Sequence, residues 1–257
     1  MKEKVAVEDL REIKYIFDKK GVKFWLEHGT LLGAVREGKI IEWDSDIDLG
    51  TWSDYREQIV AAFPEFKKRG FSAVLSRKKG TGTLIIKRLG CQVAVDLYRK
   101  KGDYAWIIPH IIHPTDEKNG TVYRTKIKGI DKLLHWLIGM FSPITFTNPE
   151  GKFIRKSEVF MSPVPLDLRQ LLAEVVWFVA DRRGCIIPLV VPKCFFQQLS
   201  TIQFYRMEFN IPSNVEKYLE YRYGEDWRTP RKKWSFKEDG AMNLEMRLCD
   251  FLGKNTS

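Results

Sequence analysis

The sequence predicts an α/β fold with a largely helical C-terminal half. Hydrophobic residues make up 44% of the 257 residues and charged residues 30%, a composition typical of a folded globular chain and not of a disordered or low-complexity one. Over the first hundred residues, apolar side chains alternate between helical spacing and short strand-like runs, and later segments return to helical spacing. These two observations define the fold class.

The N-terminal region predicts a helix, a strand and a second helix. Residues 5–20 place apolar side chains at helical spacing, and Gly21 follows as a C-cap. Residues 22–27 are β-branched and aromatic enough for a short strand. The small residues Gly29 and Thr30 then begin a Leu-rich helix, so the strand enters the helix through a tight turn.

An acidic segment, residues 44–50, alternates around Asp46 and Asp48 and predicts a strand on which both carboxylates share one face. Ser53 is a suitable N-cap for a helix that runs to Ala62. Further strands are expected in an antiparallel arrangement, with a hairpin turn at 88–91; they cover residues 71–75, 83–88 and 91–98.

The second half is less regular. Prolines punctuate residues 103–163, where we expect loops and short elements, and helical spacing returns at 167–182 and within 212–223. The basic chain beyond Gly224 is expected to fray. We therefore interpret residues 1–102 as a catalytic core and residues 103–257 as an irregular and helical part that packs on it and does not fold independently.

The net charge indicates the kind of partner, and the cysteines indicate the cellular compartment. Lys and Arg outnumber Asp and Glu by 43 to 33, and this formal charge of +10 favours an anionic partner. The four cysteines show no C-x-x-C pair and no zinc-finger spacing, which indicates a reducing compartment without structural zinc. The charged N-terminal segment does not resemble a signal peptide, so a cytoplasmic location is expected.

One apolar segment raises the question of membrane contact. Residues 130–144 are rich in Leu, Ile and aromatic residues and have lysines on their N-terminal side. Core packing is one interpretation; an interfacial helix that holds the protein at the periphery of an anionic membrane is the other. No apolar run reaches the roughly 18 residues that a membrane-spanning helix needs.

The acidic segment indicates a metal site. Asp44, Asp46 and Asp48 crowd like charges, and a divalent cation among them would offset the repulsion. Oxygen ligands suit Mg²⁺ or Mn²⁺, which complete their coordination with phosphate and water. A calcium EF-hand loop would need Gly and Glu where this chain has Leu49 and Tyr55. A solvated acidic loop is the competing interpretation.

Residues before and after this segment fit phosphate chemistry. Gly29 and Thr30 stand at the start of a helix, where a backbone approach, a hydroxyl and the helix dipole all favour a phosphate. Asp96 interrupts an apolar strand, which is costly unless it pairs or binds a cation. A structural salt bridge is its alternative. His28 is either a hydrogen-bonded structural residue or a general base.

The segment HGTLLGAVREGKIIEWDSDIDLG, residues 28–50, resembles the LicD/fukutin branch of the nucleotidyltransferase superfold, whose signature is hG[S/T] followed by DhDh. The segment IPSNVEKYLEYRYGEDWRTPRKKW, residues 211–234, is similar to the family's closing segment. The resemblance implies a mixed sheet flanked by helices. It also implies a metal-dependent transferase that moves ribitol phosphate, glycerol phosphate or phosphocholine from a CDP-alcohol to a glycan or glycolipid hydroxyl and releases CMP, as in cell-surface polysaccharide modification.

The resemblance also suggests roles for residues. Asp46 and Asp48 would hold the metal, and Asp96 would be a third ligand or the base for the acceptor hydroxyl. Gly29 and Thr30 would meet the donor phosphates. Arg36 would grip a phosphate or pair with Asp44, and Asp44 would bind a second metal or orient Arg36. His28, a candidate substrate contact, departs from the residue usual in the family.

Two other functions are considered. The same site could transfer a nucleotide from an NTP. A non-catalytic nucleic-acid-binding module is not expected, because the basic clusters are scattered and an acidic metal site repels a phosphate backbone. Trp43, just before the acidic segment, is expected to pack in the interior instead of stacking on a base.

Overall fold

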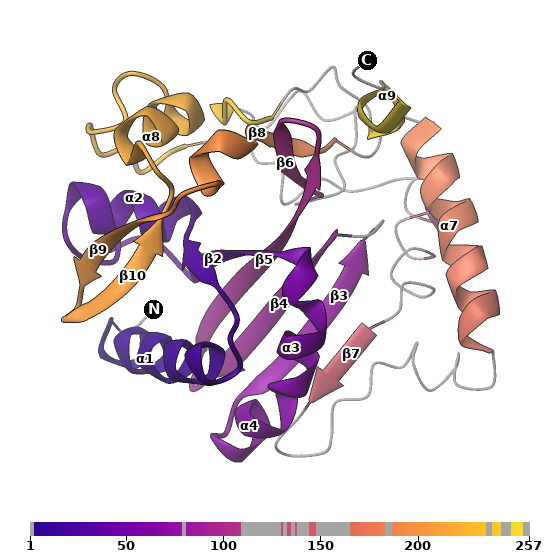
Figure 1. Ribbon diagram of the computed structural model, residues 1–257, viewed down its shortest axis with the longest axis horizontal. Helices are drawn as coiled ribbons and strands as arrows, with labels where there is room; N and C mark the ends of the chain where they lie inside the picture. Colours follow the sequence, from indigo (N-terminus) through magenta and orange to yellow (C-terminus); the bar gives the residue numbers. More distant parts are fainter. Residues whose placement is uncertain are drawn as a thin grey trace.

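A computed structural model describes residues 3–78, 81–108, 130, 133–134, 137, 144–147, 165–182, 187–234, 238–242 and 248–253. Its mixed sheet with helices around it confirms the predicted α/β fold class (Figure 1). The N-terminal elements are α1 Glu3–Lys19, β1 Phe24–Leu26, α2 His28–Arg36, β2 Ile47–Trp52, the 3₁₀ turn Ser53–Tyr55, α3 Arg56–Ala61 and α4 Phe63–Lys68. The strands that follow are β3 Ser72–Lys78, β4 Thr81–Arg88, β5 Cys91–Lys101, β6 Tyr104–Ile107 and β7 Ile144–Thr147.

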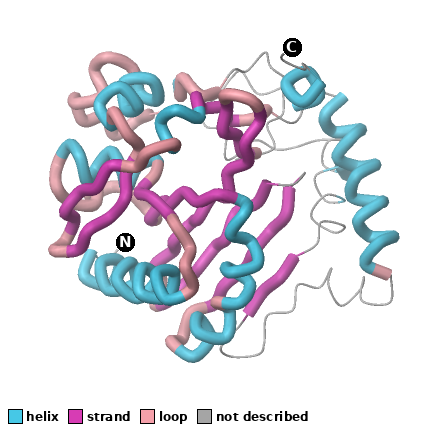
Figure 2. The backbone as a smooth tube through the Cα atoms, viewed as in Figure 1, coloured by secondary structure: helices cyan, strands magenta, loops and turns pink. Residues whose placement is uncertain are grey.

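The C-terminal part combines the expected helices with strands that the sequence analysis did not predict. Its elements are α7 Leu166–Arg182, β8 Leu189–Pro192, the 3₁₀ turn Lys193–Phe196, β9 Ser200–Phe204, β10 Met207–Ile211, α8 Val215–Tyr223 and α9 Leu248–Gly253. The strands extend the sheet of the N-terminal region, because β10 pairs with β1 and β8 pairs with β6. Figure 2 shows this continuity along the backbone tube.

The sheet runs in the order β7-β3-β4-β5-β2-β1-β10-β9, with β6 and β8 continuing from β5. Of these pairings, β2 with β5 and β1 with β10 are parallel. In the register of β2 and β5, Asp48 lies opposite Ala94 and Gly50 opposite Asp96. Since residues two apart along a strand share a face, Asp48 and Asp96 lie on the same face of the sheet.

The acidic segment is only partly a strand. β2 begins at Ile47, so Asp48 lies on the strand while Asp44 and Asp46 lie in the turn before it. The predicted alternation therefore holds from Ile47 onward and is wrong for the two earlier aspartates. This places three carboxylates at the entrance to one strand instead of along its face.

The hairpin turn and the first helix follow the sequence pattern. Leu89 and Gly90 both have positive φ, as a two-residue hairpin between β4 and β5 requires. Helix α1 buries Leu10, Ile13 and Phe17 against the sheet. It also buries Asp9, whose pKa burial raises even though Arg88 of β4 approaches to 2.6 Å. The ion pair ties α1 to the hairpin.

Where the structure describes the chain beyond Gly224, several residues are packed, contrary to the expected fraying. Trp227, Asp239 and Met242 are buried, and Tyr223 contacts Trp234 with ring centroids 5.0 Å apart. The apolar segment 130–144 lies mostly outside the described residues, so its two interpretations remain open. Among the residues that the structure describes, no helix is long and apolar enough to cross a membrane.

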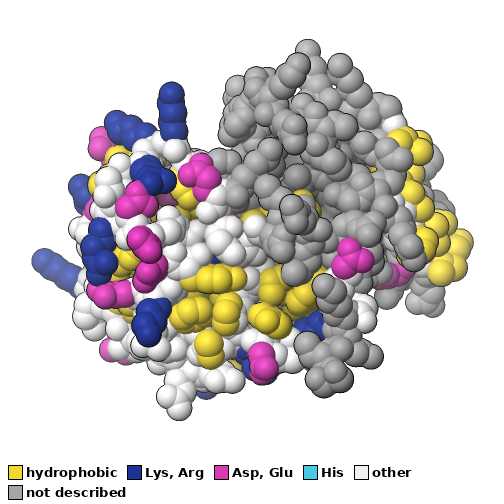
Figure 3. Space-filling view, turned by 90° about the horizontal axis from the view of Figure 1, so that it is seen from above, with side chains coloured by type: hydrophobic (Ala, Val, Ile, Leu, Met, Phe, Trp, Pro, Cys, Tyr) yellow, Lys and Arg dark blue, Asp and Glu magenta, His cyan; other side chains and the backbone are white. Residues whose placement is uncertain are grey.

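Helix α7 has two apolar sides. Val176, Trp177 and Ala180 pack in a small second core with Trp106 and Phe251. The opposite side leaves a stripe of apolar side chains exposed, and hydrophobic side chains are visible along this edge of the molecule in Figure 3; the stripe comprises Leu168, Leu171, Val175, Phe178 and Val179.

An aromatic cluster supports the sheet beneath the candidate site. Trp25 of β1 stacks on Phe196 at 4.7 Å between centroids and lies beside Tyr98 of β5. Gly50 of β2 makes room for this ring, because a Cβ there would lie 2.4 Å from Nε1 of Trp25. The indole therefore crosses directly over the backbone of β2.

We predict that Gly50→Ala destabilises the fold by about 1–3 kcal/mol, the usual cost of overpacking a rigid core. Urea unfolding followed by circular dichroism measures the change. Gly253→Ala in α9 is the matched control, because nothing lies within 4 Å of its Cβ position and Ala favours a helix. Equal stability of Gly50→Ala and the wild type would contradict the observed packing.

Candidate active site

The site is built where β1 turns into α2. Glu27 ends the strand, and its carboxylate accepts a hydrogen bond from the backbone N–H of His28 at 3.4 Å, as an N-cap. His28 has a positive φ of 46°, so the chain reverses sharply into the helix. Thr30 accepts a hydrogen bond from the backbone N–H of Asp48 at 2.8 Å. The start of α2 is thereby joined to the acidic strand.

The acidic turn lies directly against the helix start. A Cβ on Gly29 would come within 2.2 Å of Oδ2 of Asp44, so this carboxylate occupies the space that the glycine leaves open. Burial and the neighbouring charge of Asp46 raise the pKa of Asp44. Asp46 in turn accepts a hydrogen bond from Nε2 of Gln92 on β5 at 3.2 Å. Asp44 therefore lies against α2, and Asp46 contacts β5.

Asp48 is the most strongly perturbed carboxyl group of the turn and strand. Burial raises its pKa to about 8, and the charges of Asp46, Asp44 and Asp96 add to the effect against an opposing contribution from His28. The four aspartates are thus close enough to repel one another. The ionised form of Asp48 needs additional positive charge nearby.

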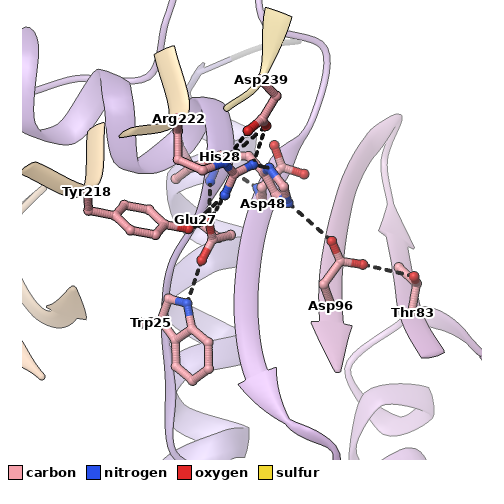
Figure 4. A network of polar contacts seen from close by, with 10 residues as sticks. Trp25, Glu27, His28, Asp48, Thr83, Asp96, Tyr218, Arg222 and Asp239 are labelled. Atoms are coloured by element: carbon pink, nitrogen blue, oxygen red, sulfur yellow. Dashed lines mark hydrogen bonds and ion pairs between the residues drawn. The ribbon is translucent and has the colours of Figure 1, made fainter. Parts of the chain in front are cut away.

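His28 and Asp96 form a direct pair. Nε2 of His28 lies 3.2 Å from Oδ2 of Asp96, and the hydroxyl of Thr83 on β4 donates to the other carboxylate oxygen at 2.8 Å (Figure 4). Asp96 is therefore held from two sides by residues of α2 and β4.

Beneath His28 lies a buried ionic network centred on Arg222 of α8 (Figure 4). Its guanidinium contacts Oδ2 of Asp239 at 2.6 Å and Oε1 of Glu27 at 2.9 Å. It also donates to Nδ1 of His28 at 2.9 Å. Glu27 further accepts hydrogen bonds from Trp25, at 2.6 Å, and from the hydroxyl of Tyr218. The network joins three distant parts of the chain.

These contacts set the electrostatics of His28. Burial and the guanidinium of Arg222 act to lower its pKa, but the hydrogen bond to Asp96 and the charges of Glu27 and Asp48 outweigh them, and the pKa rises to about 9. A guanidinium has no acceptor, so the contact with Arg222 uses the lone pair of Nδ1. A proton on Nδ1 would require the ring to give up that contact.

Arg36, a predicted site residue, and Trp43, a predicted packing residue, both have surroundings other than expected. Arg36 pairs with Glu37 at 2.6 Å and donates to the carbonyl of Trp227 at 3.4 Å, so the alternative in which it pairs with Asp44 is not what the structure shows. Trp43 is 41% exposed. The expectation that it packs in the interior is therefore wrong.

The donor set fits a hard divalent cation in its chemistry. The turn and strand supply carboxylate oxygens from Asp44, Asp46 and Asp48, whose mutual repulsion is itself the argument for positive charge. Asp96 is already engaged by His28 and Thr83. Within the described part of the chain, no three His, Cys, Asp or Glu side chains meet as a ready-made metal cage. A cation here would complete its coordination with a substrate phosphate.

The mixed sheet, the helix start and the acidic turn together are the arrangement expected of a nucleotidyltransferase-type domain. Residues 21–137 match the family described as LicD/FKTN/FKRP, nucleotidyltransferase domain. This confirms the resemblance inferred from the sequence. All the predicted site residues, from His28 to Asp96, lie inside the matched segment.

Individual relatives match over short stretches. The human ribitol 5-phosphate transferase FKRP is 49% identical over 45 residues, 18% of this chain and 9% of that protein. The human ribitol-5-phosphate transferase FKTN is 41% identical over 63 residues, 24% and 14%. An uncharacterised protein of Rickettsia prowazekii is 32% identical over 68 residues, 26% of each chain. The chain thus spans about a quarter or less of the length of these curated relatives.

Solved structures give a looser similarity. A solution structure of the antibiotic-resistance factor ANT(2'')-Ia has a TM-score of 0.33 and 12% sequence identity, and covers 70% of this chain and 94% of its own. A crystal structure of ANT(2'')-Ia with an adenylylated tobramycin has a TM-score of 0.30 and 11% identity, over 66% and 95%.

Sequence analysis missed Glu27, Tyr218, Arg222 and Asp239. Glu27 reads as the end of a strand, and Arg222 as a polar residue on a surface helix. The signal that could have found two of them is the similarity of residues 211–234 to the family's closing segment, which contains Tyr218 and Arg222. That similarity implied a segment close to the site without indicating which side chains reach it.

We predict that Arg222→Met lowers the free energy of unfolding by about 3–5 kcal/mol, because it leaves Glu27 and Asp239 buried without their cation. Urea unfolding measures it. Arg228→Met is the matched control, since Arg228 pairs with Glu216 at the surface and such pairs contribute about 0–1 kcal/mol. Similar losses in both variants would refute the central place of Arg222.

Proposed function

We propose that this chain is a transferase of the LicD type, which moves a phosphorylated alcohol from a CDP-activated donor to a hydroxyl of a glycan or glycolipid and releases CMP. The observation that carries the proposal is the position of Asp48. It lies among three other aspartates, beside the start of α2, within the segment that matches the LicD/FKTN/FKRP family. The names of the curated relatives support a ribitol phosphate as the transferred group.

The start of α2 is suited to bind the donor's phosphates. Gly29 is half-buried beside the acidic turn, and the N-terminus of a helix favours an anion. In the proposed mechanism, Asp46 and Asp48, with Asp44 beside them, would hold Mg²⁺ or Mn²⁺. Such an ion supplies charge neutralisation at the phosphate when bound.

Asp96 is placed to orient the acceptor. Its carboxylate is held by His28 and Thr83 and lies on the same face of the sheet as Asp48. In the proposed mechanism it accepts the proton of the attacking oxygen, while the hydrogen bond from Nε2 of His28 keeps it in position. Phosphoryl transfer depends mainly on such positioning and charge neutralisation, so no covalent nucleophile on the protein is needed.

The decisive experiment supplies the protein with CDP-ribitol, CDP-glycerol or CDP-choline, or with each NTP, in the presence of Mg²⁺ and a glycan acceptor. Release of CMP from a CDP-alcohol supports the proposal. Release of pyrophosphate from an NTP would instead support nucleotide transfer by the same site. Hydrolysis or transfer with neither class of donor would refute both.

We predict that Asp48→Asn and Asp46→Asn each reduce the transfer rate at least about 100-fold. Each substitution removes a carboxylate that would hold the cation, and the cation would neutralise the phosphate. CMP release measures this, and circular dichroism checks that the fold is intact. Asp54→Asn is the control, because Asp54 is exposed and forms a surface ion pair with Lys100. Full activity of either site variant with Mg²⁺ would overturn the mechanism.

A further inference from the structure

Trp43 stands at the tip of a rigid turn beside the candidate site. The backbone N–H of Asp44 bonds to the carbonyl of Ile41 at 3.0 Å, which closes the turn. Ile41 is buried, and a Cβ on Gly33 would lie only 3.0 Å from its side chain, so the base of the turn is tightly packed on α2. The turn therefore presents an exposed indole one residue from Asp44.

A lysine from the C-terminal part lies over this indole. Nζ of Lys232 is 5.4 Å from the centre of the Trp43 ring. The segment that carries Lys232 is held at both ends, by buried Trp227 and by the contact of Trp234 with Tyr223. The position of Lys232 above Trp43 thus follows from a packed segment.

Among the described residues, no acidic side chain pairs with Lys232. Its neighbours Arg228 and Arg231 form ion pairs with Glu216 and with Asp226. In the part of the chain that the structure describes, no ion pair of Lys232 is found, and its contact there is the indole. Figure 3 shows Lys and Arg side chains gathered on the side of the molecule away from α7.

An exposed aromatic ring beside an ammonium group matches the two parts of a nucleotide, its base and its phosphates. The flat face of a nucleobase stacks on an indole, and this is tolerant of base identity. The phosphates of the same ligand attract an ammonium group. Neither a simple sugar nor inorganic phosphate uses both features.

We propose that Trp43 and Lys232 form the nucleotide-recognition part of the site, in which the base of a nucleoside diphosphate stacks on Trp43 and Lys232 contacts its phosphates. This inference rests on the proposed function, because it places the donor's cytidine beside the acidic turn. A stacked base takes the position of Lys232 on the ring or uses the opposite face. The segment beyond Gly224 then takes part in donor recognition.

Calorimetric titration of CDP, CMP and cytidine into the full chain with Mg²⁺ tests the proposal. Trp43→Ala is expected to weaken CDP and cytidine binding about tenfold, the usual effect of losing one stacking partner. Trp43→Phe should retain most of the affinity, which separates stacking from a loss of folding. Lys232→Met should weaken CDP binding more than cytidine binding, because cytidine lacks phosphates.

Tyr15→Ala is the matched control. Tyr15 lies on α1, its ring is 50% exposed, and the side chains of Arg69 and Lys19 lie over it. This variant should bind CDP as the wild type does. CDP affinity of Trp43→Ala within twofold of the wild type would overturn the inference and leave the proposed function standing. CDP binding that depends on Trp43, without transfer from any donor, would support this inference and overturn the proposed function. A wild-type chain that binds no nucleotide would refute both.

Discussion

The buried guanidinium of Arg222 is the interaction on which the rest of the site depends. A fully buried arginine is stable only when its charge and its donors are satisfied, and here Glu27 and Asp239 supply two carboxylates at 2.9 and 2.6 Å. These partners come from the end of β1 and from the segment after α8. One interaction therefore determines where the C-terminal part meets the nucleotidyltransferase-type domain, and the packing of α8 cannot shift without exposing or unpairing a charge.

The same interaction shapes the electrostatics of the functional side chains. Arg222 also donates to His28, and His28 faces Asp96, so the network runs from the buried ion pair to the sheet face that carries Asp48. Along this path carboxylates outnumber cations. Arg222 is committed to Glu27 and Asp239, which leaves His28 to face the remaining aspartates. Burial, with the charges of the neighbouring aspartates, raises the pKa of Asp48 to about 8 against the opposing effect of His28. A site with this imbalance favours a cation or a cation-bound phosphate.

The sequence predicted those features that depend on local pattern. The helix at the N-terminus, the tight turn at Gly29 and the hairpin at Leu89 and Gly90 follow from spacing and turn chemistry, and the structure contains all three. Strands β9 and β10 were missed because they lie at one end of the sheet and their burial does not alternate cleanly. Arg222 was missed for a different reason: charged residues are rarely buried, and its partners are 17 and 195 residues away.

Two parts of the molecule thus contribute differently to the site. The segment that matches the LicD/FKTN/FKRP family, residues 21–137, contains the aspartates and the helix start that any phosphoryl transfer of this kind would need. Arg222, Asp239 and Lys232 lie beyond it. Arg222, which pairs with Asp239, contacts His28 and Glu27, while Lys232 lies over an indole next to the acidic turn. The positions of His28 and Glu27 therefore depend on the C-terminal part, and the nucleotide recognition that we propose would depend on it as well. Since that part also supplies strands of the same sheet, substrate preference could diverge there while the aspartates and their chemistry stay unchanged.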